Sequence, residues 1–308
     1  MTSKLFLHIG HGKTGSSFLQ SCFSKNRDHL LSHGGVVYPI DPEDQSQYNK
    51  ISSGNGRLFQ KAARENALSD LPWDSNANAI FYSSEFLYND TSWMGCEAVF
   101  DGSLVSAVDI LLFIRNPLEM LSTCYQQIVK RGGYFKSFDE YAAGFKFYGR
   151  LLRVLQDLQG RDRCSLRVCN YSRISHTEDV AAAWLGCPPF KTVPRSRINR
   201  SLTFSELFFQ IEINRYFGKS GSFVADALCN ELPDQEAYVF SPSQQALTMF
   251  LEHEMRYIEA INRIIPETEA LEISSVARDA EFPEVFLGED QLRLIAESFG
   301  KKFARQND

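Results

Sequence analysis

The sequence contains no pair of cysteines spaced as C-x-x-C, and its seven cysteines are an odd number. It therefore has neither a zinc-ligand pattern nor a disulfide framework, and we expect reduced thiols in a cytoplasmic protein. No apolar run approaches the roughly 20 residues that a membrane-spanning helix needs, so no membrane association is expected. No repeat, low-complexity tract or linker interrupts the 308 residues. This continuity predicts a single domain over residues 1–308.

An excess of basic residues is also missing. Lys and Arg together number 32 and Asp and Glu 38, which gives a formal charge of −6. A protein that binds nucleic acid or a heavily sulfated glycan needs a broad basic surface, so we expect neither partner. A neutral or cationic small molecule, or a neutral sugar, suits this charge better than a polyanion does. A local basic pocket is still compatible with it.

The most informative stretch is residues 5–20, LFLHIGHGKTGSSFLQ. An apolar run precedes three glycines, one lysine and three hydroxyl side chains, and an apolar pattern at helical spacing follows. Glycines permit a tight turn, a helix N-terminus carries a partial positive charge, and lysine adds a full one. The stretch predicts a strand, a phosphate-binding loop and a helix. The candidate phosphate-binding residues are Gly12, Lys13, Thr14, Gly15, Ser16 and Ser17.

The loop differs from the Walker A loop of nucleoside triphosphatases, in which lysine directly follows the last glycine. Gly10 and Gly15 have the required separation, but Ser16 occupies the lysine position and Lys13 lies inside the loop. The sequence therefore disfavours a small P-loop kinase, which we keep as an alternative.

Apolar strands alternate with helical segments in the first two thirds of the chain. This alternation predicts an α/β fold of three layers, with about five parallel strands and helices on both faces. A core over about residues 1–200 and a mostly helical C-terminal part over about 201–308 are expected. The expected strands are 5–9, 36–38, 79–82, 108–114 and 164–169, and the expected helices of the core are 16–32, 57–70, 97–107, 138–158 and 177–185.

Three chemically active side chains directly follow expected strands: Lys13, Glu85 and Arg115. Ligands of parallel sheets bind at the carboxyl ends of the strands, so we expect these three residues to lie together at one edge. Asn116 and Pro117 suit a helix start, which would place Arg115 at the positive end of a helix.

A second phosphate site is predicted around Arg115. Its guanidinium and a hydroxyl on the following helix could hold a phosphate by charge-assisted hydrogen bonds. Thr123 lies eight positions after Arg115, and Ser122 beside it is the alternative hydroxyl, about 100° away around the helix. A purely structural helix cap is the other interpretation of the Arg115-Asn116-Pro117 motif.

The segment HIGHGKTGSSFLQ resembles the 5′-phosphosulfate loop of the sulfotransferase family, whose bacterial members often read close to H-I-G-x-x-K-T-G-[ST]-[ST]-x-x-Q. The segment from Arg115 to Tyr125 resembles the family's 3′-phosphate motif, with Thr123 in place of its serine. The segments GGVVYP, YQQIVKRGG, SFDEYA, LRVCNYSR and INRSLTFSE are also similar to bacterial members. The resemblance implies a P-loop-like fold and sulfuryl transfer from 3′-phosphoadenosine 5′-phosphosulfate to a hydroxyl or amine, without a metal.

The resemblance also implies roles for individual residues. Lys13 would neutralise charge on the bridging oxygen, Arg115 and Thr123 would bind the 3′-phosphate, and Glu85 would act as general base. A helix-capping or ion-pairing role for Glu85 is the alternative, and His11 and His33 are rival bases. The basic run Arg195, Arg197 and Arg200, within the loop from Lys191 to Arg200, could close over the donor or be a solvated loop. A non-catalytic nucleotide-binding protein of the same fold also fits these motifs.

Overall fold

The structure is a computed structural model of the chain that describes residues 3–44, 46–48, 54–73, 77–194, 200–273 and 283–304. The chain folds into two compact units. The first unit comprises Met1–Asn116, Phe147–Ile198 and Tyr257–Leu271, and the second comprises Pro117–Lys146, Asn199–Arg256 and Glu272–Asp308. The sequence placed the change from core to helical part near residue 200. In the structure, Pro117–Lys146 also belongs to the second unit. Tyr257–Leu271, which lies after residue 200, belongs to the first unit.

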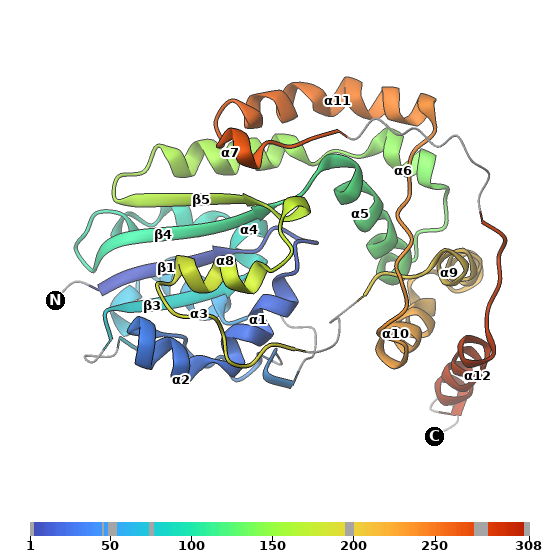
Figure 1. The fold of residues 1–308 in the computed structure, drawn as a ribbon, viewed down its shortest axis with the longest axis horizontal. Helices are drawn as coiled ribbons and strands as arrows, with labels where there is room; N and C mark the ends of the chain where they lie inside the picture. The colour runs from blue at the N-terminus through green and yellow to red at the C-terminus, as the bar shows by residue number, and fades with distance from the viewer. Residues whose placement is uncertain are drawn as a thin grey trace. The chain divides into compact units, whose positions relative to one another are not determined.

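The first unit is built on a five-stranded sheet in the order β2-β3-β1-β4-β5, and every pair is parallel. Figure 1 shows the strands side by side, with β1 in the interior of the sheet. The expected parallel sheet is confirmed. Its strands are β1 (Ser3–Ile9), β2 (Val36–Val37), β3 (Ala79–Ser84), β4 (Val105–Ile114) and β5 (Cys164–Asn170).

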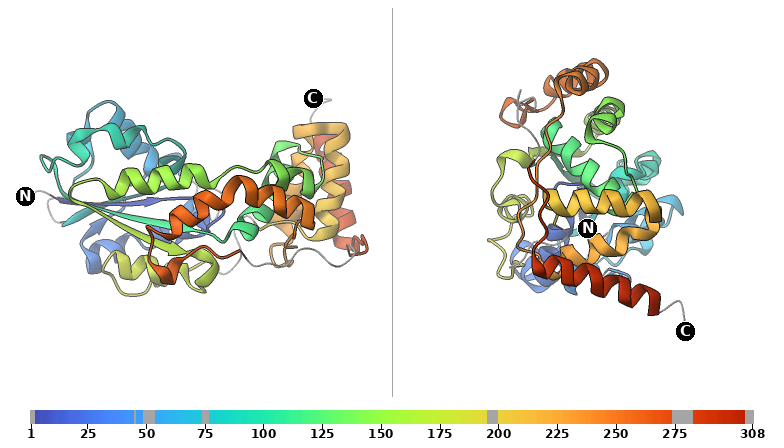
Figure 2. Two further views of the ribbon diagram at one scale, coloured as in Figure 1. Left: turned by 90° about the horizontal axis from the view of Figure 1, so that it is seen from above. Right: turned by 90° about the vertical axis from the view of Figure 1, so that its right-hand side faces the viewer.

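Successive side chains of each strand point to opposite faces of the sheet. Helices pack on both faces and bury these side chains. Phe6, Phe81 and Leu111 belong to one apolar cluster together with residues of α1 and α8. On the other face, the Tyr82 ring lies 5.6 Å from the ring of Phe59 in α3. Figure 2 shows helices on both sides of the sheet. The helices of this unit are α1 (Ser16–Lys25), α2 (Arg27–His29), α3 (Gly56–Arg64), α4 (Phe86–Asn89), α7 (Tyr148–Gln159) and α8 (Thr177–Trp184).

Three expected helices of this part are shorter than the pattern suggested. The helix expected over 57–70 ends at Arg64, and a separate 3₁₀ turn follows at Leu68–Asp70. The helix expected over 16–32 is interrupted at Asn26, whose side-chain amide donates to the carbonyls of Cys22 and Thr192, both at 2.7 Å. The helix expected over 97–107 is only a 3₁₀ turn at Glu97–Val99, and β4 begins earlier than expected. There the Asp101 carboxylate accepts the Ser103 N–H at 2.7 Å and Gly102 has a φ of 79°, which together turn the chain into the strand.

The helix expected over 138–158 is two helices, α6 (Phe138–Gly144) and α7. Phe145 at the break packs 6.2 Å from Phe250 in the second unit, whereas Phe147 packs 4.6 Å from His11 in the first. The two rings pack in different units, and this ends a helix that the residue pattern alone would continue. Tertiary packing therefore overrides the helical periodicity here.

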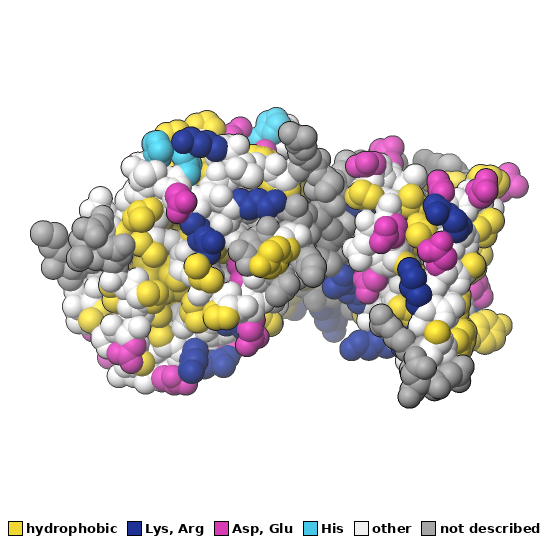
Figure 3. Space-filling model, turned by 90° about the horizontal axis from the view of Figure 1, so that it is seen from below, with side chains coloured by type: hydrophobic (Ala, Val, Ile, Leu, Met, Phe, Trp, Pro, Cys, Tyr) yellow, Lys and Arg dark blue, Asp and Glu magenta, His cyan; other side chains and the backbone are white. Residues whose placement is uncertain are grey.

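The second unit is helical in the residues that the structure describes. Its helices are α5 (Pro117–Gly132), α6, α9 (Phe204–Phe217), α10 (Ser222–Glu231), α11 (Gln244–Asn262), whose last residues belong to the first unit, and α12 (Glu289–Ala304). A capping box between Thr203 and Glu206 starts α9. The helical C-terminal part is thus confirmed. On the face drawn in Figure 3, acidic and basic side chains are mixed, in line with the modest net charge.

Candidate functional site

The loop between β1 and α1 has an unusual backbone. Lys13 has a φ of 71° and Gly15 a φ of 76°. A lysine in the left-handed region costs on the order of 1 kcal/mol or more, and such strain persists where neighbouring contacts hold it. The Thr14 hydroxyl donates to the His11 carbonyl at 2.6 Å and braces the turn from inside. The loop therefore has a defined shape that presents Lys13.

The N-terminus of α1 opens onto this loop. Gly15 is the N-cap residue and has no side chain with which to cap the first N–H groups. Ser16 and Ser17 add hydroxyls in the first turn. Apart from the chain neighbours of Gly12, no atom of the described residues lies within 4 Å of the place that a Cβ on Gly12 would occupy. Backbone donors, hydroxyls and a cation therefore converge on one loop, which is the composition of an anion site.

Glu85 lies against the start of the loop. The Gly10 N–H donates to the Ser84 carbonyl at 3.0 Å, which ties the loop to the end of β3. A Cβ on Gly10 would be 2.8 Å from Ser16 Oγ and 3.0 Å from Glu85 Cγ. Only glycine fits this approach, because any side chain would push Glu85 and the serine away. The glycine thus brings a carboxyl group next to the predicted phosphate loop.

The environment of Glu85 changes its basicity. Burial raises the pKa of its carboxyl group above the usual value, while the Lys13 charge lowers it. A carboxylate of raised pKa is a stronger base than an exposed one. Glu85 is therefore suited to accept a proton, in a position where the Lys13 charge acts on it.

Arg115 reaches the same loop from the end of β4. Its Nη1 donates to the Lys13 carbonyl at 3.0 Å, and its guanidinium carbon lies 5.3 Å from the centre of the Tyr171 ring. The Tyr171 ring also contacts the loop, since a Cβ on Gly15 would lie 3.1 Å from it. The Tyr148 hydroxyl donates to the Arg115 carbonyl at 3.1 Å. Two tyrosines thus fix the arginine and the loop in one arrangement.

The predicted gathering of Lys13, Glu85 and Arg115 is confirmed. They follow β1, β3 and β4, which are neighbours in the sheet, and the contacts described above join them. Tyr171 comes directly after β5, and this position places it at the same edge of the sheet. Nothing in the sequence pointed to Tyr148, because it lies on a helix far from any motif.

The two histidines considered as bases lie in environments that differ from that of Glu85. His11 is buried between the rings of Tyr88 and Phe147, with centroid distances of 5.1 and 4.6 Å. Burial lowers the pKa of its imidazole to about 3, so it is neutral near pH 7. His33 is exposed and precedes β2, which places it toward the amino edge of the sheet. The geometry favours Glu85 over both.

The other predicted residues belong to the second unit. Ser122 is buried, and its Oγ accepts the Phe240 N–H at 2.9 Å. Thr123 is half-buried and its hydroxyl donates to the Glu119 carbonyl. The Arg200 side chain is fully buried and donates to both carboxylate oxygens of Glu206, at 2.7 and 2.9 Å. Ser122 and Arg200 thus have interior roles that sequence reasoning did not anticipate, which leaves Thr123 as the candidate ligand of this group.

Arg195 and Arg197 lie outside the described residues. In the part of the chain that is described, no group of three or more His, Cys, Asp or Glu residues is arranged to hold a metal ion. The helices described there include none with the length and apolar character needed to cross a membrane.

Comparison with known proteins yields little. No family model matches the sequence, and no curated protein does so either. Among solved structures, the chain is similar to a crystal structure of a sulfotransferase from Alicyclobacillus acidocaldarius. That similarity has 16% sequence identity and a TM-score of 0.37, and it covers 70% of this chain and 94% of the other. A likeness of this size carries no functional argument, so any function must be argued from the residues of the site.

Proposed function

We propose that this protein is a sulfotransferase that moves a sulfuryl group from 3′-phosphoadenosine 5′-phosphosulfate to a hydroxyl or amine of a small molecule or sugar. The observation that supports this most is the hydrogen bond from Arg115 to the Lys13 carbonyl. It brings a second cation to the predicted phosphate-binding loop. The lysine of this loop does not directly follow the last glycine, as it would in a Walker A loop. A donor with phosphate groups at both ends of its ribose suits two neighbouring cationic sites.

Each residue has a defined task in this proposal. The loop amides and the hydroxyls of Ser16 and Ser17 bind the 5′-phosphate, and Lys13 faces the oxygen that bridges phosphorus and sulfur. Arg115 binds the 3′-phosphate. Thr123 is assigned to the same phosphate on the sequence motif alone.

The proposed reaction is an in-line displacement. The acceptor oxygen or nitrogen forms a bond to sulfur while the bond from sulfur to the bridging oxygen breaks. The electron pair of the broken bond stays on the 5′-phosphate, where Lys13 offsets the growing negative charge. Glu85 takes the acceptor proton. The products are the sulfated acceptor and adenosine 3′,5′-bisphosphate.

The direct test is an acceptor screen with the sulfate donor, read as a mass increase of the acceptor, alongside a thermal-shift comparison of nucleotides. Adenosine 3′,5′-bisphosphate at 100 times its Kd should stabilise the protein by about 2.7 kcal/mol, and ATP with magnesium should do so much less. Bisphosphate binding without transfer to any acceptor would favour a non-catalytic nucleotide-binding protein. Stabilisation by magnesium ATP alone would favour the kinase.

Replacement of the Glu85 carboxyl should change both stability and pH dependence. Because the folded pKa is raised, the folded protein binds the proton more tightly than the unfolded chain, so stability falls as pH rises between the unfolded and folded pKa values. Glu85→Gln should therefore raise the melting temperature at pH 7 relative to wild type. The gain should disappear below the unfolded pKa. Melting curves from pH 4 to 8 measure it.

The same variant should lose the acidic limb of the pH profile of kcat/KM for a hydroxyl acceptor, because the group that must be deprotonated is gone. Glu65→Gln, at an exposed position after α3, is the matched control and should match wild type. An unchanged acidic limb in Glu85→Gln would show that another group accepts the proton.

A further inference from the structure

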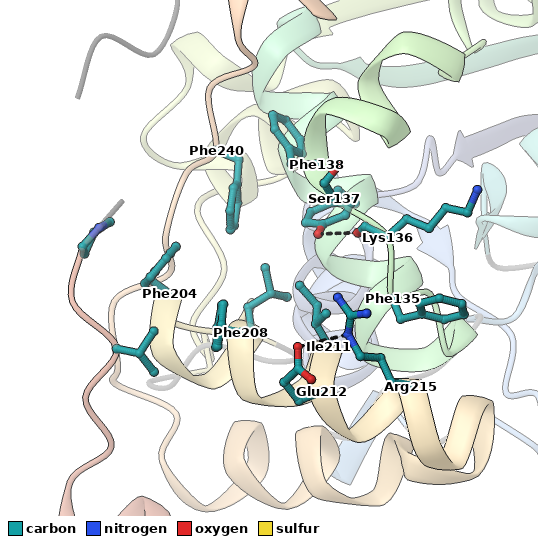
Figure 4. A pocket seen from close by; sticks show the side chains of 14 residues that line it. Phe135, Lys136, Ser137, Phe138, Phe204, Phe208, Ile211, Glu212, Arg215 and Phe240 are labelled. Carbon is teal, nitrogen blue, oxygen red and sulfur yellow. Dashed lines mark hydrogen bonds and ion pairs between the residues drawn. The ribbon is translucent and has the colours of Figure 1, made fainter. Parts of the chain in front are cut away.

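The second unit encloses a pocket of about 310 Å³ that the proposed sulfuryl transfer does not use. Figure 4 shows it between α9, the end of α5 and the segment that carries Phe240. Small-molecule sites span about 300 to 1,000 Å³, so this pocket is at the small end of the range. Its wall is mainly aromatic, and the rings are those of Tyr125, Phe135, Phe138, Phe204, Phe208 and Phe240.

The rings form a continuous surface. Tyr125 lies 5.1 Å from Phe138 and 5.5 Å from Phe240, both edge to face, and Phe204 lies 6.2 Å from Phe240. These are the separations that aromatic pairs favour. Tyr125, Phe138 and Phe240 are buried within this wall, and the rings that it leaves accessible are the half-buried Phe204 and the exposed Phe208 and Phe135. The wall can therefore accept another ring in the same packing pattern.

The polar groups of the lining already have partners in the protein, and the Lys136 ammonium lies 3.9 Å from the Glu140 carboxylate. The Tyr125 hydroxyl donates to the Lys136 carbonyl at 2.9 Å, and the Ser137 hydroxyl takes part in the capping box of α6. Arg215 and Glu212 form an ion pair at 3.0 Å and so offset each other's charge. A charged ligand would have to compete with these contacts. The lining thus suits a neutral ligand held by its apolar surface.

Hydrogen bonds hold the segments that line the pocket, and exposed rings lie at its rim. The Phe240 N–H donates to Ser122 Oγ, and the Phe286 N–H donates to Ser205 Oγ at 2.9 Å, which fixes the segment with Val285 to α9. Phe208 and Phe135 are 46% and 45% exposed. Half-exposed phenylalanines at the rim of an aromatic pocket are apolar area that a ligand would cover.

From these features, we infer that the pocket binds a neutral molecule of one or two aromatic rings. The ligand packs against the accessible rings of Phe204 and Phe208 and covers the exposed part of Phe208. This site requires neither a nucleotide nor the residues around Lys13. Binding at this pocket can therefore be tested independently of the proposed sulfuryl transfer.

The test is a fluorescence titration of the full chain with 2-naphthol, without nucleotide. We expect saturable binding at one site with a Kd on the order of 10 to 100 μM. The anion 2-naphthoate, with the same ring system, should bind at least about tenfold more weakly because its charge must be desolvated. Absence of saturable 2-naphthol binding, or equal binding of 2-naphthoate, would overturn the inference.

Two variants locate the site. Phe208→Ala removes a half-exposed ring and should weaken 2-naphthol binding about fivefold or more, and Ile211→Trp should fill the pocket and abolish binding. Tyr216→Ala is the control, since Tyr216 is 83% exposed on the same helix and does not line the pocket. Wild-type affinity in both pocket variants would place the bound naphthol elsewhere and refute the assignment. Melting temperatures identify any variant that has not folded, and the other one then decides.

Discussion

Lys13→Ala is expected to lower the turnover number for sulfuryl transfer by about 100- to 1,000-fold, because the proposed mechanism uses the Lys13 charge to stabilise the bridging oxygen. Affinity for adenosine 3′,5′-bisphosphate should stay within about threefold of wild type, since the loop amides, Ser16 and Ser17 remain. Alanine at a φ of 71° bears the same backbone strain as lysine, so the substitution isolates the charge. Steady-state kinetics and calorimetric titration of the bisphosphate measure the two quantities.

The matched control for Lys13→Ala is Lys25→Ala. Lys25 lies in the last turn of α1, at the opposite end of the helix from the loop, and its removal should leave turnover unchanged. Wild-type turnover in Lys13→Ala would refute the proposed mechanism. A loss of bisphosphate affinity equal to the loss of turnover would instead make Lys13 a simple phosphate ligand, since the interaction would then be equally strong in the ground state.

Arg115→Ala should weaken the binding of adenosine 3′,5′-bisphosphate by about 100-fold, because charge-assisted hydrogen bonds to a phosphate contribute about 1.5 to 3 kcal/mol each. Adenosine 5′-monophosphate lacks the 3′-phosphate and should bind the variant almost as well as it binds wild type. Arg115→Lys keeps the charge but loses the planar fork, so an intermediate affinity is expected. Calorimetric titration of both nucleotides measures the difference.

The monophosphate shows whether Arg115 binds the 3′-phosphate itself or only holds the loop in place. Arg115 also donates to the Lys13 carbonyl, so its removal could loosen the loop. An equal loss of affinity for both nucleotides would mean that Arg115 acts only through the loop. Arg161→Ala provides a control, because Arg161 lies over the Phe100 ring before β5, away from the loop.

The sequence by itself determined the sheet and the contents of its carboxyl edge. Apolar strands of parallel type are nearly continuous hydrophobic runs, as in β4, so they can be read without knowledge of their neighbours. Parallel order then places whatever follows each strand at one edge, which is why the meeting of Lys13, Glu85 and Arg115 could be predicted. The loop could also be predicted from its glycines, because tight turns and close approach of the backbone to other groups require glycine.

Only the tertiary structure decided which polar side chains the interior uses. Arg200 was indistinguishable in sequence from the other arginines of its basic run, yet it is buried against Glu206. His11 lies between two aromatic rings, and the Ser122 hydroxyl accepts a backbone N–H from Phe240. Each of these interaction partners is distant in sequence or is selected by packing. The local residue pattern therefore does not predict which partner is used.

The division into two units and the aromatic pocket likewise came from packing. Phe145 and Phe147 are two residues apart, but their rings pack in different units, and the helix expected across them is broken. The six rings of the pocket come from three separate segments of the chain, and nothing in their spacing predicts that they meet. Local sequence fixes strand, turn and helix start because those depend on neighbouring residues, whereas burial partners depend on the whole fold.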